Sequence, residues 1–183
     1  MPATLPLTSP RIRPMAARDL ARVQAIEAEA FGCEAWPIEA FREVLAAFAH
    51  SRPPRGGLWV AEHRRTGEIL GYAGVEVSAL RGEMDLINIA VGRAWRRQGV
   101  GAALLRHVLA HCRRLHVPLL WLRVRAGNRE ARAFYRRLGF RPRGRFAGYY
   151  QDPDEAAVIM AMEVEGEVYG EGTRDAERGT RNT

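Results

Sequence analysis

The sequence predicts an α/β domain in which a mixed central β-sheet is flanked by about four helices. Stretches with helical spacing of apolar residues alternate with short strand-like stretches. The chain has 183 residues, which suits one domain better than two, and its 47% hydrophobic and 8% aromatic residues are typical of a globular protein. The predicted order of elements is β-α-α-β-β-β-α-β-α-β-β.

The N-terminal half is predicted to contain a strand, two helices and a pair of strands. The first strand lies in "IRPMAARDL" and leads into a helix over residues 18–30, where apolar residues recur at helical spacing. A second helix covers residues 38–48. After the loop "SRPPRGG", the segment "LWVAEHRRTGEILGYAGVEVSAL" is typical of two strands joined by a turn at residues 65–67.

The C-terminal half is predicted to alternate strands and helices and to end in two strands. Its second helix begins after the N-cap residue Asn128 and ends at Gly139. In chain order the predicted elements are a strand over 83–91, a helix over 101–115, a strand from 118, the helix between Asn128 and Gly139, and strands near 140–146 and 157–164.

Residues 11–165 are expected to form this single domain. Residues 166–183 are polar, so we expect a disordered tail there. No apolar stretch approaches the roughly 20 residues that a membrane span needs. Residues 1–14 lack the basic-then-apolar layout of a secretion signal. We therefore expect a cytoplasmic protein with no membrane partner.

The charge of the chain favours an anionic partner. Its formal net charge is +7, and all 28 basic residues are arginine. RNA, a ribosome or a phosphate-rich cofactor would each suit this charge. The two cysteines, Cys33 and Cys112, lie far apart without metal-ligand spacing, so we expect free thiols and no metal site.

The segment Arg96-x-x-Gly99-x-Gly101 lies between a predicted strand and a predicted helix. Backbone N–H groups converge at a helix N-terminus, and glycines let an anion approach them closely, so this segment predicts a phosphate site. The G-x-G-x-x-G and P-loop motifs of nucleotide-binding proteins are both absent. Two interpretations of the segment remain open. It could bind the pyrophosphate of another cofactor, or it could be a glycine-rich turn with solvent-facing arginines.

A family resemblance rests on two blocks of sequence. The motif follows "NIAV", and after it comes "WLRVRAGNREARAFYRRLGF". In this order and spacing they resemble the GNAT superfamily of N-acetyltransferases, most closely its RimI branch, which acetylates the N-terminal alanine of a small-subunit ribosomal protein. The resemblance covers roughly residues 12–164 and is strongest over 87–140. It implies a single GNAT-like domain, acetyl-CoA as the cofactor, and direct acetyl transfer to the N-terminal α-amine of a protein.

The resemblance also implies which residues bind acetyl-CoA. The strand before the motif would line the acetyl and pantetheine groups, the motif would hold the pyrophosphate, and an asparagine would contact the CoA arm. The implied residues are Ile89, Ala90, Val91, Arg97, Gln98, Gly99, Val100, Gly101, Ala102 and Asn128. Asn128 also has a purely structural interpretation as a helix N-cap.

In this family a tyrosine in the helix after that asparagine protonates the leaving sulfur. Tyr135 in "AFYRRLGF" matches its position, so the resemblance makes Tyr135 the catalytic acid. Tyr135 also lies on the apolar stripe of its predicted helix, so a core aromatic is the alternative interpretation.

The usual base of the RimI branch is missing. The branch has a glutamate in "WLEV", where this chain has Arg123. A guanidinium cannot accept a proton at neutral pH. The position of a base in other GNAT enzymes points to Asp85 as a catalytic base acting through water, on the same strand face as Glu83 and Ile87. An Asp85–Arg123 ion pair, which would weaken that base, is an equally supported alternative.

Three aromatic residues are candidates for binding the acceptor. Trp36 lies with Glu34 and Glu39 at the junction of two helices, where the family builds a peptide-binding loop. Tyr149 and Tyr150 resemble a paired tyrosine late in RimI-like chains. Packing is the alternative interpretation of each.

Loss of a good base affects acceptor amines unequally. At pH 7 an α-amine is about one-tenth neutral, whereas a lysine is less than about one-thousandth neutral. This favours an N-terminal amine over a lysine side chain. The alternatives are a small-amine acetyltransferase and a non-catalytic module that binds acetyl-CoA or RNA. The stretches "RRLGFRPRGR" and "HCRRLH" allow a weak contact with ribosomal RNA, and we expect no DNA partner.

Overall fold

The computed structural model describes residues 9–50, 56–78 and 82–164. Within these ranges the chain forms one seven-stranded sheet and four α-helices, so the predicted fold class and order of elements are confirmed. The elements are β1 (Arg11–Pro14), α1 (Leu20–Phe31), α2 (Ile38–His50), β2 (Gly56–Glu62), β3 (Ile69–Val77), β4 (Met84–Val91), α3 (Val100–Arg114), β5 (Leu119–Arg125), α4 (Arg129–Arg137), β6 (Arg141–Gln151) and β7 (Asp154–Glu163).

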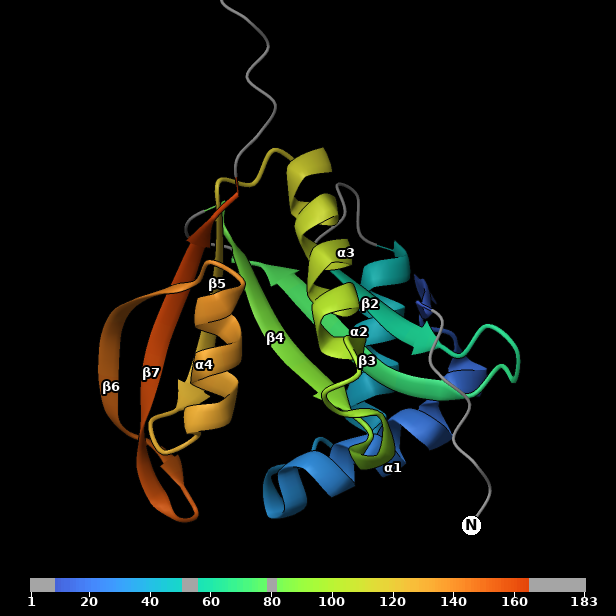
Figure 1. The fold of residues 1–183 in the computed structure, drawn as a ribbon, viewed down its shortest axis with the longest axis horizontal. Helices are drawn as coiled ribbons and strands as arrows, with labels where there is room; N and C mark the ends of the chain where they lie inside the picture. Colours follow the sequence, from blue (N-terminus) through green and yellow to red (C-terminus); the bar gives the residue numbers. More distant parts are fainter. Residues whose placement is uncertain (1–8, 51–55, 79–81, 165–183) are drawn as a thin grey trace, which may run out of the picture.

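The strands are ordered β1-β2-β3-β4-β5-β7-β6, and β4 and β5 are the one parallel pair among them. The crossover between these two strands is α3, as a parallel connection requires. Their register extends only over Met84–Leu120 and Asp85–Trp121. Figure 1 shows the two strands diverging beyond this short paired stretch. The remainder of β4 therefore has an edge that β5 does not cover.

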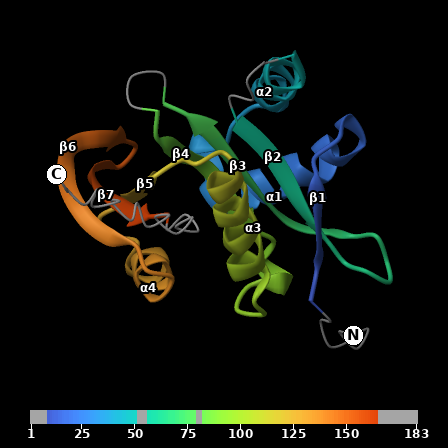
Figure 2. The same ribbon diagram turned by 90° about the horizontal axis from the view of Figure 1, so that it is seen from above.

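Helices cover both faces of the sheet. Figure 2 shows α3 and α4 on one face and α1 and α2 on the other. The larger core cluster includes Leu104 and Val108 of α3 and Tyr135 of α4. A second cluster on the opposite face includes Ile26 of α1 and Phe41 of α2. The helical spacing of these residues gives each helix one apolar face toward the sheet.

A β-bulge interrupts β4 in its middle. Gly74 of β3 pairs with Asn88 and Val75 pairs with Leu86, so Ile87 is the extra residue. Leu86 belongs to the core cluster beside α3, whereas Asn88 faces α1. In a regular strand residues two apart share a face. The strict alternation expected along 83–91 therefore ends at Ile87.

The last two strands are longer than predicted. Strand β6 continues to Gln151 and includes both tyrosines of "YYQ", and β7 begins at Asp154. Nearly every residue of β6 is exposed to solvent on this edge of the sheet. A strand that is exposed on both faces has no hydrophobic alternation, which explains why its true length was not predicted.

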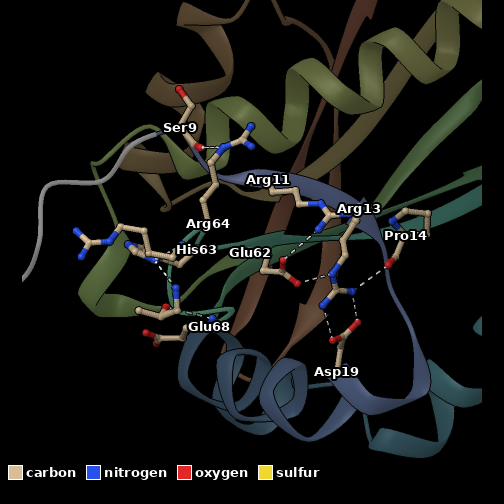
Figure 3. A network of polar contacts seen from close by, with 11 residues as sticks. Ser9, Arg11, Arg13, Pro14, Asp19, Glu62, His63, Arg64 and Glu68 are labelled. Atoms are coloured by element: carbon tan, nitrogen blue, oxygen red, sulfur yellow. Dashed lines mark hydrogen bonds and ion pairs between the residues drawn. The ribbon is translucent and has the colours of Figure 1, made fainter.

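A polar network fixes β1 against β2 and the start of α1 (Figure 3). The guanidinium of Arg13 donates to both carboxylate oxygens of Asp19, at 2.6 and 2.8 Å, and to Glu62 at 2.5 Å. Asp19 also accepts a bond from the backbone N–H of Ala16 at 2.8 Å. Hydrogen bonding from Arg13 lowers the pKa of Asp19.

The predicted tail over residues 166–183 lies outside the described residues, and the domain bounds of 11–165 stay a prediction. Both cysteines are free thiols, with Cys33 exposed and Cys112 buried. In the part of the chain that the structure describes, no helix is long and apolar enough to cross a membrane.

Candidate active site

A pocket of about 540 Å³ lies where β4, the start of α3 and α4 meet. It brings together most of the residues expected to bind the cofactor, and it includes the expected acid. The predicted residues that line it are Ile89, Ala90, Val91, Arg97, Gly99, Gly101, Ala102, Asn128 and Tyr135. Arg96, Arg137, Glu130, Ala131, Phe134 and Leu138 complete the lining.

The start of α3 forms an anion cradle at one side of this pocket. Arg97 and Gly99 adopt positive φ angles of 60° and 84°, and the helix begins at Val100. The first N–H groups of a helix have no intrahelical acceptor, and the helix dipole favours negative charge beside them. The first turn contains no acidic residue. A phosphate therefore meets free donors and two neighbouring arginines, Arg96 and Arg97, without a competing carboxylate.

Gly101 allows α3 and α4 to approach each other. A Cβ at this position would lie 3.3 Å from Cζ of Phe134 and 3.7 Å from Cγ2 of Val91.

Two other predicted residues of the motif do not line the pocket with their side chains. Gln98 donates to the carbonyl of Ala94 at 2.8 Å, and Val100 is buried in the core. Only their backbone groups can face an anion in the cradle.

Tyr135 lies at the boundary between the core and the pocket. Its ring packs against Phe140 at a centroid distance of 5.7 Å, yet it also lines the pocket. The packing and the catalytic interpretations are therefore compatible. Burial, and to a smaller extent nearby Tyr150, raises the pKa of Tyr135. The phenol consequently remains neutral, and able to donate a hydrogen bond, throughout the neutral pH range.

Asn128, like Tyr135, is compatible with both a structural and a binding interpretation. Its Oδ1 accepts a hydrogen bond from the backbone N–H of Ala131 at 3.0 Å, so it is the N-cap of α4. It also lines the pocket opposite the cradle residues. The cap uses the oxygen of the amide and fixes the direction of the side chain.

Asp85 and Arg123 form an ion pair, which the sequence analysis gave as the alternative to a base role for Asp85. Their closest oxygen and nitrogen are 3.3 Å apart, and the exposed fractions of the two side chains are 22% and 44%. Asp85 occupies the last paired position of β4, where β5 diverges. Neither residue lines the pocket. If Asp85 is the base, it must accept a proton at the point where β4 and β5 separate, with the guanidinium of Arg123 beside it.

The aromatic residues expected on the acceptor side lie outside the pocket. Trp36 is half-buried and packs against Phe41 at a ring distance of 5.5 Å. Tyr149 is exposed, and its ring lies 5.0 Å from that of Tyr150. Burial, followed by the neighbouring phenol of Tyr149, raises the pKa of Tyr150 to about 12. The ring of Tyr150 stacks under the guanidinium of Arg125 at 4.3 Å.

Arg125 connects the two segments that were expected on the acceptor side, and the sequence analysis did not predict this link. It pairs with Glu34 at 2.6 Å and with Glu155 at 3.1 Å. It also donates to the carbonyls of Asp152 and Pro153, at 2.9 and 3.2 Å. The connection between α1 and α2 is thereby tied to the turn between β6 and β7. Alternation along β5 could have placed Arg125 on the face of Arg123, but its partners are distant in sequence.

A second residue that the sequence analysis missed is Glu27 of α1. Its side chain is buried, with 1% of the residue exposed, among the apolar residues of the second core cluster. The available signal was a glutamate directly after Ile26, on the apolar side of an amphipathic helix. Among the described residues, no three His, Cys, Asp or Glu side chains are grouped so that they could hold a metal ion.

Comparisons with known proteins agree with this geometry. The model of the acetyltransferase (GNAT) family matches residues 20–140. The ribosomal protein bS18-alanine N-acetyltransferase of Escherichia coli is 38% identical over 102 residues, which are 55% of this chain and 68% of that protein. The N-alpha-acetyltransferase RimI of Mycobacterium tuberculosis is 32% identical over 146 residues, 78% of this chain and 85% of that protein.

The fold agrees as well. The crystal structure of the ribosomal-protein-S18-alanine N-acetyltransferase from Escherichia coli superposes with a TM-score of 0.70 and 31% sequence identity. The superposition covers 86% of this chain and 97% of the other.

Proposed function

Because this chain belongs to the acetyltransferase (GNAT) family, we propose that it transfers the acetyl group of acetyl-CoA to the N-terminal α-amine of a protein. The observation that carries the proposal is the pocket in which the anion cradle, the uncovered edge of β4 and Tyr135 meet. The Escherichia coli relative, which the sequence comparison and the structural comparison both find, is named as an alanine N-acetyltransferase of a ribosomal protein. The proposed acceptor is therefore the N-terminal alanine of a small-subunit ribosomal protein, which this enzyme would meet in the cytoplasm.

The pocket fits acetyl-CoA in its volume and in its chemistry. Ligand pockets typically enclose about 300–1,000 Å³, and this one encloses about 540 Å³. The free N–H groups at Gly99 and Gly101 would hold the pyrophosphate, with Arg97 at its side. The apolar side chains of Ile89 and Val91 would line the pantetheine arm.

The bound cofactor supplies an activated thioester, and the chain supplies the groups around it. Backbone N–H groups on the uncovered edge of β4 are positioned to stabilise negative charge on a carbonyl oxygen. The neutral phenol of Tyr135 would donate its proton to the departing sulfur, so that CoA leaves as the thiol, and the phenol would then regain a proton from solvent. Cys112 is buried in the core, Cys33 contacts Asp152, and neither lines the pocket, which argues against an acyl-enzyme. Direct attack by the amine follows.

The acceptor needs a neutral nitrogen, and Asp85 is the proposed proton acceptor, acting through water. Its carboxylate is shared with the guanidinium of Arg123, which lies 3.3 Å away. An α-amine requires less help than a lysine because about one-tenth of it is already neutral at pH 7. The ion pair thus supports an α-amine as the acceptor.

Ribosomal RNA is a proposed weak partner in the same reaction. Strand β6 exposes Arg141, Arg143 and Arg145, and the chain carries a formal net charge of +7. Positive charge of this kind would favour encounter with an acceptor that is bound to RNA.

The test is mass spectrometry of short peptides that begin with Ala, Ser, Gly or Met, and of one with only an internal lysine, after incubation with enzyme and acetyl-CoA. We expect a single acetyl group on the Ala-terminal peptide and none on the internal lysine. The enzyme contains no lysine, so its own side chains add no acetyl-lysine background. Acetylation of free small amines with none on any N-terminus would overturn the proposed acceptor in favour of a small-amine acetyltransferase.

A further inference from the structure

Glu27 is a buried carboxylate that holds three elements together. Its Oε1 accepts hydrogen bonds from the backbone N–H of Trp36 and from Nδ2 of Asn88, each at 3.0 Å. Its Oε2 accepts a bond from the hydroxyl of Tyr72. These donors lie on the connection between α1 and α2, on β4 and on β3. One side chain of α1 therefore satisfies donors from three separate segments.

One of the two segments bound by Oε1 belongs to the pocket strand, and the other is the connection expected on the acceptor side. Asn88 directly follows the bulge residue Ile87 and precedes Ile89, which lines the cofactor pocket. Trp36 lies two residues after Glu34, which Arg125 ties to the turn between β6 and β7. Glu27 thereby sets the distance between the acceptor-side connection, residues 32–37, and the pocket strand.

The geometry distinguishes positioning from proton transfer. A catalytic base must present a lone pair to the amine or to an intervening water. Both oxygens of Glu27 already accept hydrogen bonds, and the residue is only 1% exposed. Burial raises the pKa of Glu27, while the bonds from Trp36 and Asn88 act in the opposite direction. From this position the carboxylate can hold Trp36, Asn88 and Tyr72 in place through the hydrogen bonds that it accepts.

We propose that Glu27 is a positioning residue for acetyl transfer, which holds residues 32–37 and the β4 bulge in one fixed arrangement. The inference rests on the proposed function, because it assigns the acceptor to the α1–α2 side of the pocket. Small displacements of a positioned acceptor are costly, since an error of about 1 Å can reduce a rate by about 100-fold. Glu27 acts on the rate through Trp36 and Asn88 and touches neither substrate.

The test compares Glu27→Ala with Glu27→Gln, with Asn88→Ala as a milder second variant. A glutamine retains an acceptor oxygen for Trp36 and Asn88, and its amide can donate to the oxygen of Tyr72. For Glu27→Ala we expect a lower kcat and a higher peptide KM, which together reduce kcat/KM by about tenfold. For Asn88→Ala we expect a change in the same direction. The Kd of acetyl-CoA is expected to stay within about threefold, and Glu27→Gln to recover most of the loss.

Asp19→Ala is the matched control. Asp19 is also a buried carboxylate that accepts three hydrogen bonds, but it directly precedes α1, its donors are Arg13 and Ala16, and it does not line the pocket (Figure 3). Its loss is expected to lower the thermal midpoint without changing the peptide KM of the folded enzyme. Equal kinetic defects in Asp19→Ala and Glu27→Ala would overturn the inference in favour of general destabilisation. A loss in Glu27→Gln as large as in Glu27→Ala would overturn it in favour of a base.

Hydrogen exchange separates this inference from the proposed function. Faster exchange over residues 32–37 and 86–90 in Glu27→Ala, but not in Asp19→Ala, is the expected result. If the wild-type enzyme acetylates no N-terminus, the proposed function fails, yet the exchange still decides whether Glu27 fixes these segments. Unchanged exchange in both segments would overturn the inference even if the wild-type enzyme is active.

Discussion

At the scale of single residues, the burial of Tyr135 raises the pKa of its phenol and keeps it protonated, as a proton donor must be. The phenol is therefore able, near neutral pH, to donate its proton to a leaving group. For Tyr135→Phe we expect kcat to fall by about 100-fold, since one positioned donor to the leaving sulfur is lost. The Kd of acetyl-CoA, measured by calorimetry, should stay unchanged because the ring remains. A variant with full kcat would assign Tyr135 to packing against Phe140 alone.

The pair formed by Asp85 and Arg123 supports a second prediction at this scale. Asp85→Asn should lower kcat/KM for an Ala-terminal peptide by about tenfold at pH 7 if the carboxylate accepts the proton. The deficit should shrink toward pH 9, because an α-amine with a pKa near 8 is then mostly neutral without help. Arg123→Ala should retain or increase kcat/KM, since it removes the cation beside the base.

The pH profile of kcat/KM for these variants is the measurement, with Glu83→Gln as the control on the same segment. If Asp85→Asn and Glu83→Gln both keep full kcat/KM at every pH, no carboxylate of this segment is the base. The α-amine would then lose its proton to solvent before it binds.

At the scale of elements, the acceptor side depends on the contact between the α1–α2 connection and the β6–β7 turn. Arg125 makes this contact through Glu34 and Glu155. For Arg125→Ala we expect the peptide KM to rise by about tenfold, because both segments lose a shared partner. The Kd of acetyl-CoA should change little, since Arg125 does not line the cofactor pocket.

A matched control is Arg143→Ala, which removes an arginine–glutamate pair of similar length, 3.0 Å to Glu163, on the exposed edge of the sheet. Exposed pairs contribute little to stability. If both variants raise the peptide KM equally, general positive charge attracts the acceptor and the contact through Arg125 has no special role.

The same scale shows what the sequence could predict. Helices α3 and α4 and the cradle between β4 and α3 depend on residues close together in the chain, and their periodicity and glycines were sufficient to predict them. The bulge at Ile87 depends on the register with β3, which no local pattern encodes. Glu27 and Arg125 find their partners between 9 and 91 residues away, so only the folded chain brings them into contact.

At the scale of the whole molecule, the sheet separates two functions. The cofactor pocket lies on the face covered by α3 and α4, and the acceptor-side connection belongs to the face covered by α1 and α2. Between these two faces, β4 and β5 pair over only two residue positions, so the rest of β4 is not paired with β5. If the acceptor binds beside the α1–α2 connection as proposed, acetyl transfer requires both faces to be held in position, and the contacts of Glu27 and Arg125 would do so.

Two histidines make the stability of the whole fold dependent on pH. His107 and His111 of α3 pack against Trp59 at ring distances of 5.3 and 4.8 Å, and Nε2 of His111 is buried without a hydrogen-bond partner among the described residues. Burial, and then the charge of Arg114, lowers the pKa of both. The unfolded chain therefore binds protons first as the pH falls through about 6.5. The contribution of these two histidines to the free energy of unfolding is therefore fully present above this pH and is lost as the pH falls further.

We expect the thermal midpoint of the wild-type protein to fall between pH 7.5 and pH 5.5, and His111→Phe to fall less over the same interval. Phenylalanine keeps the contact with Trp59 but binds no proton, so it removes one source of the linkage. The raised pKa of Glu27 acts in the opposite direction but is common to both proteins, and the comparison cancels it. His50→Gln, at the exposed end of α2, is the control. Parallel pH profiles for wild type and His111→Phe would mean that His111 is protonated equally in the folded and unfolded chains, and the pH dependence would then have to come from other groups.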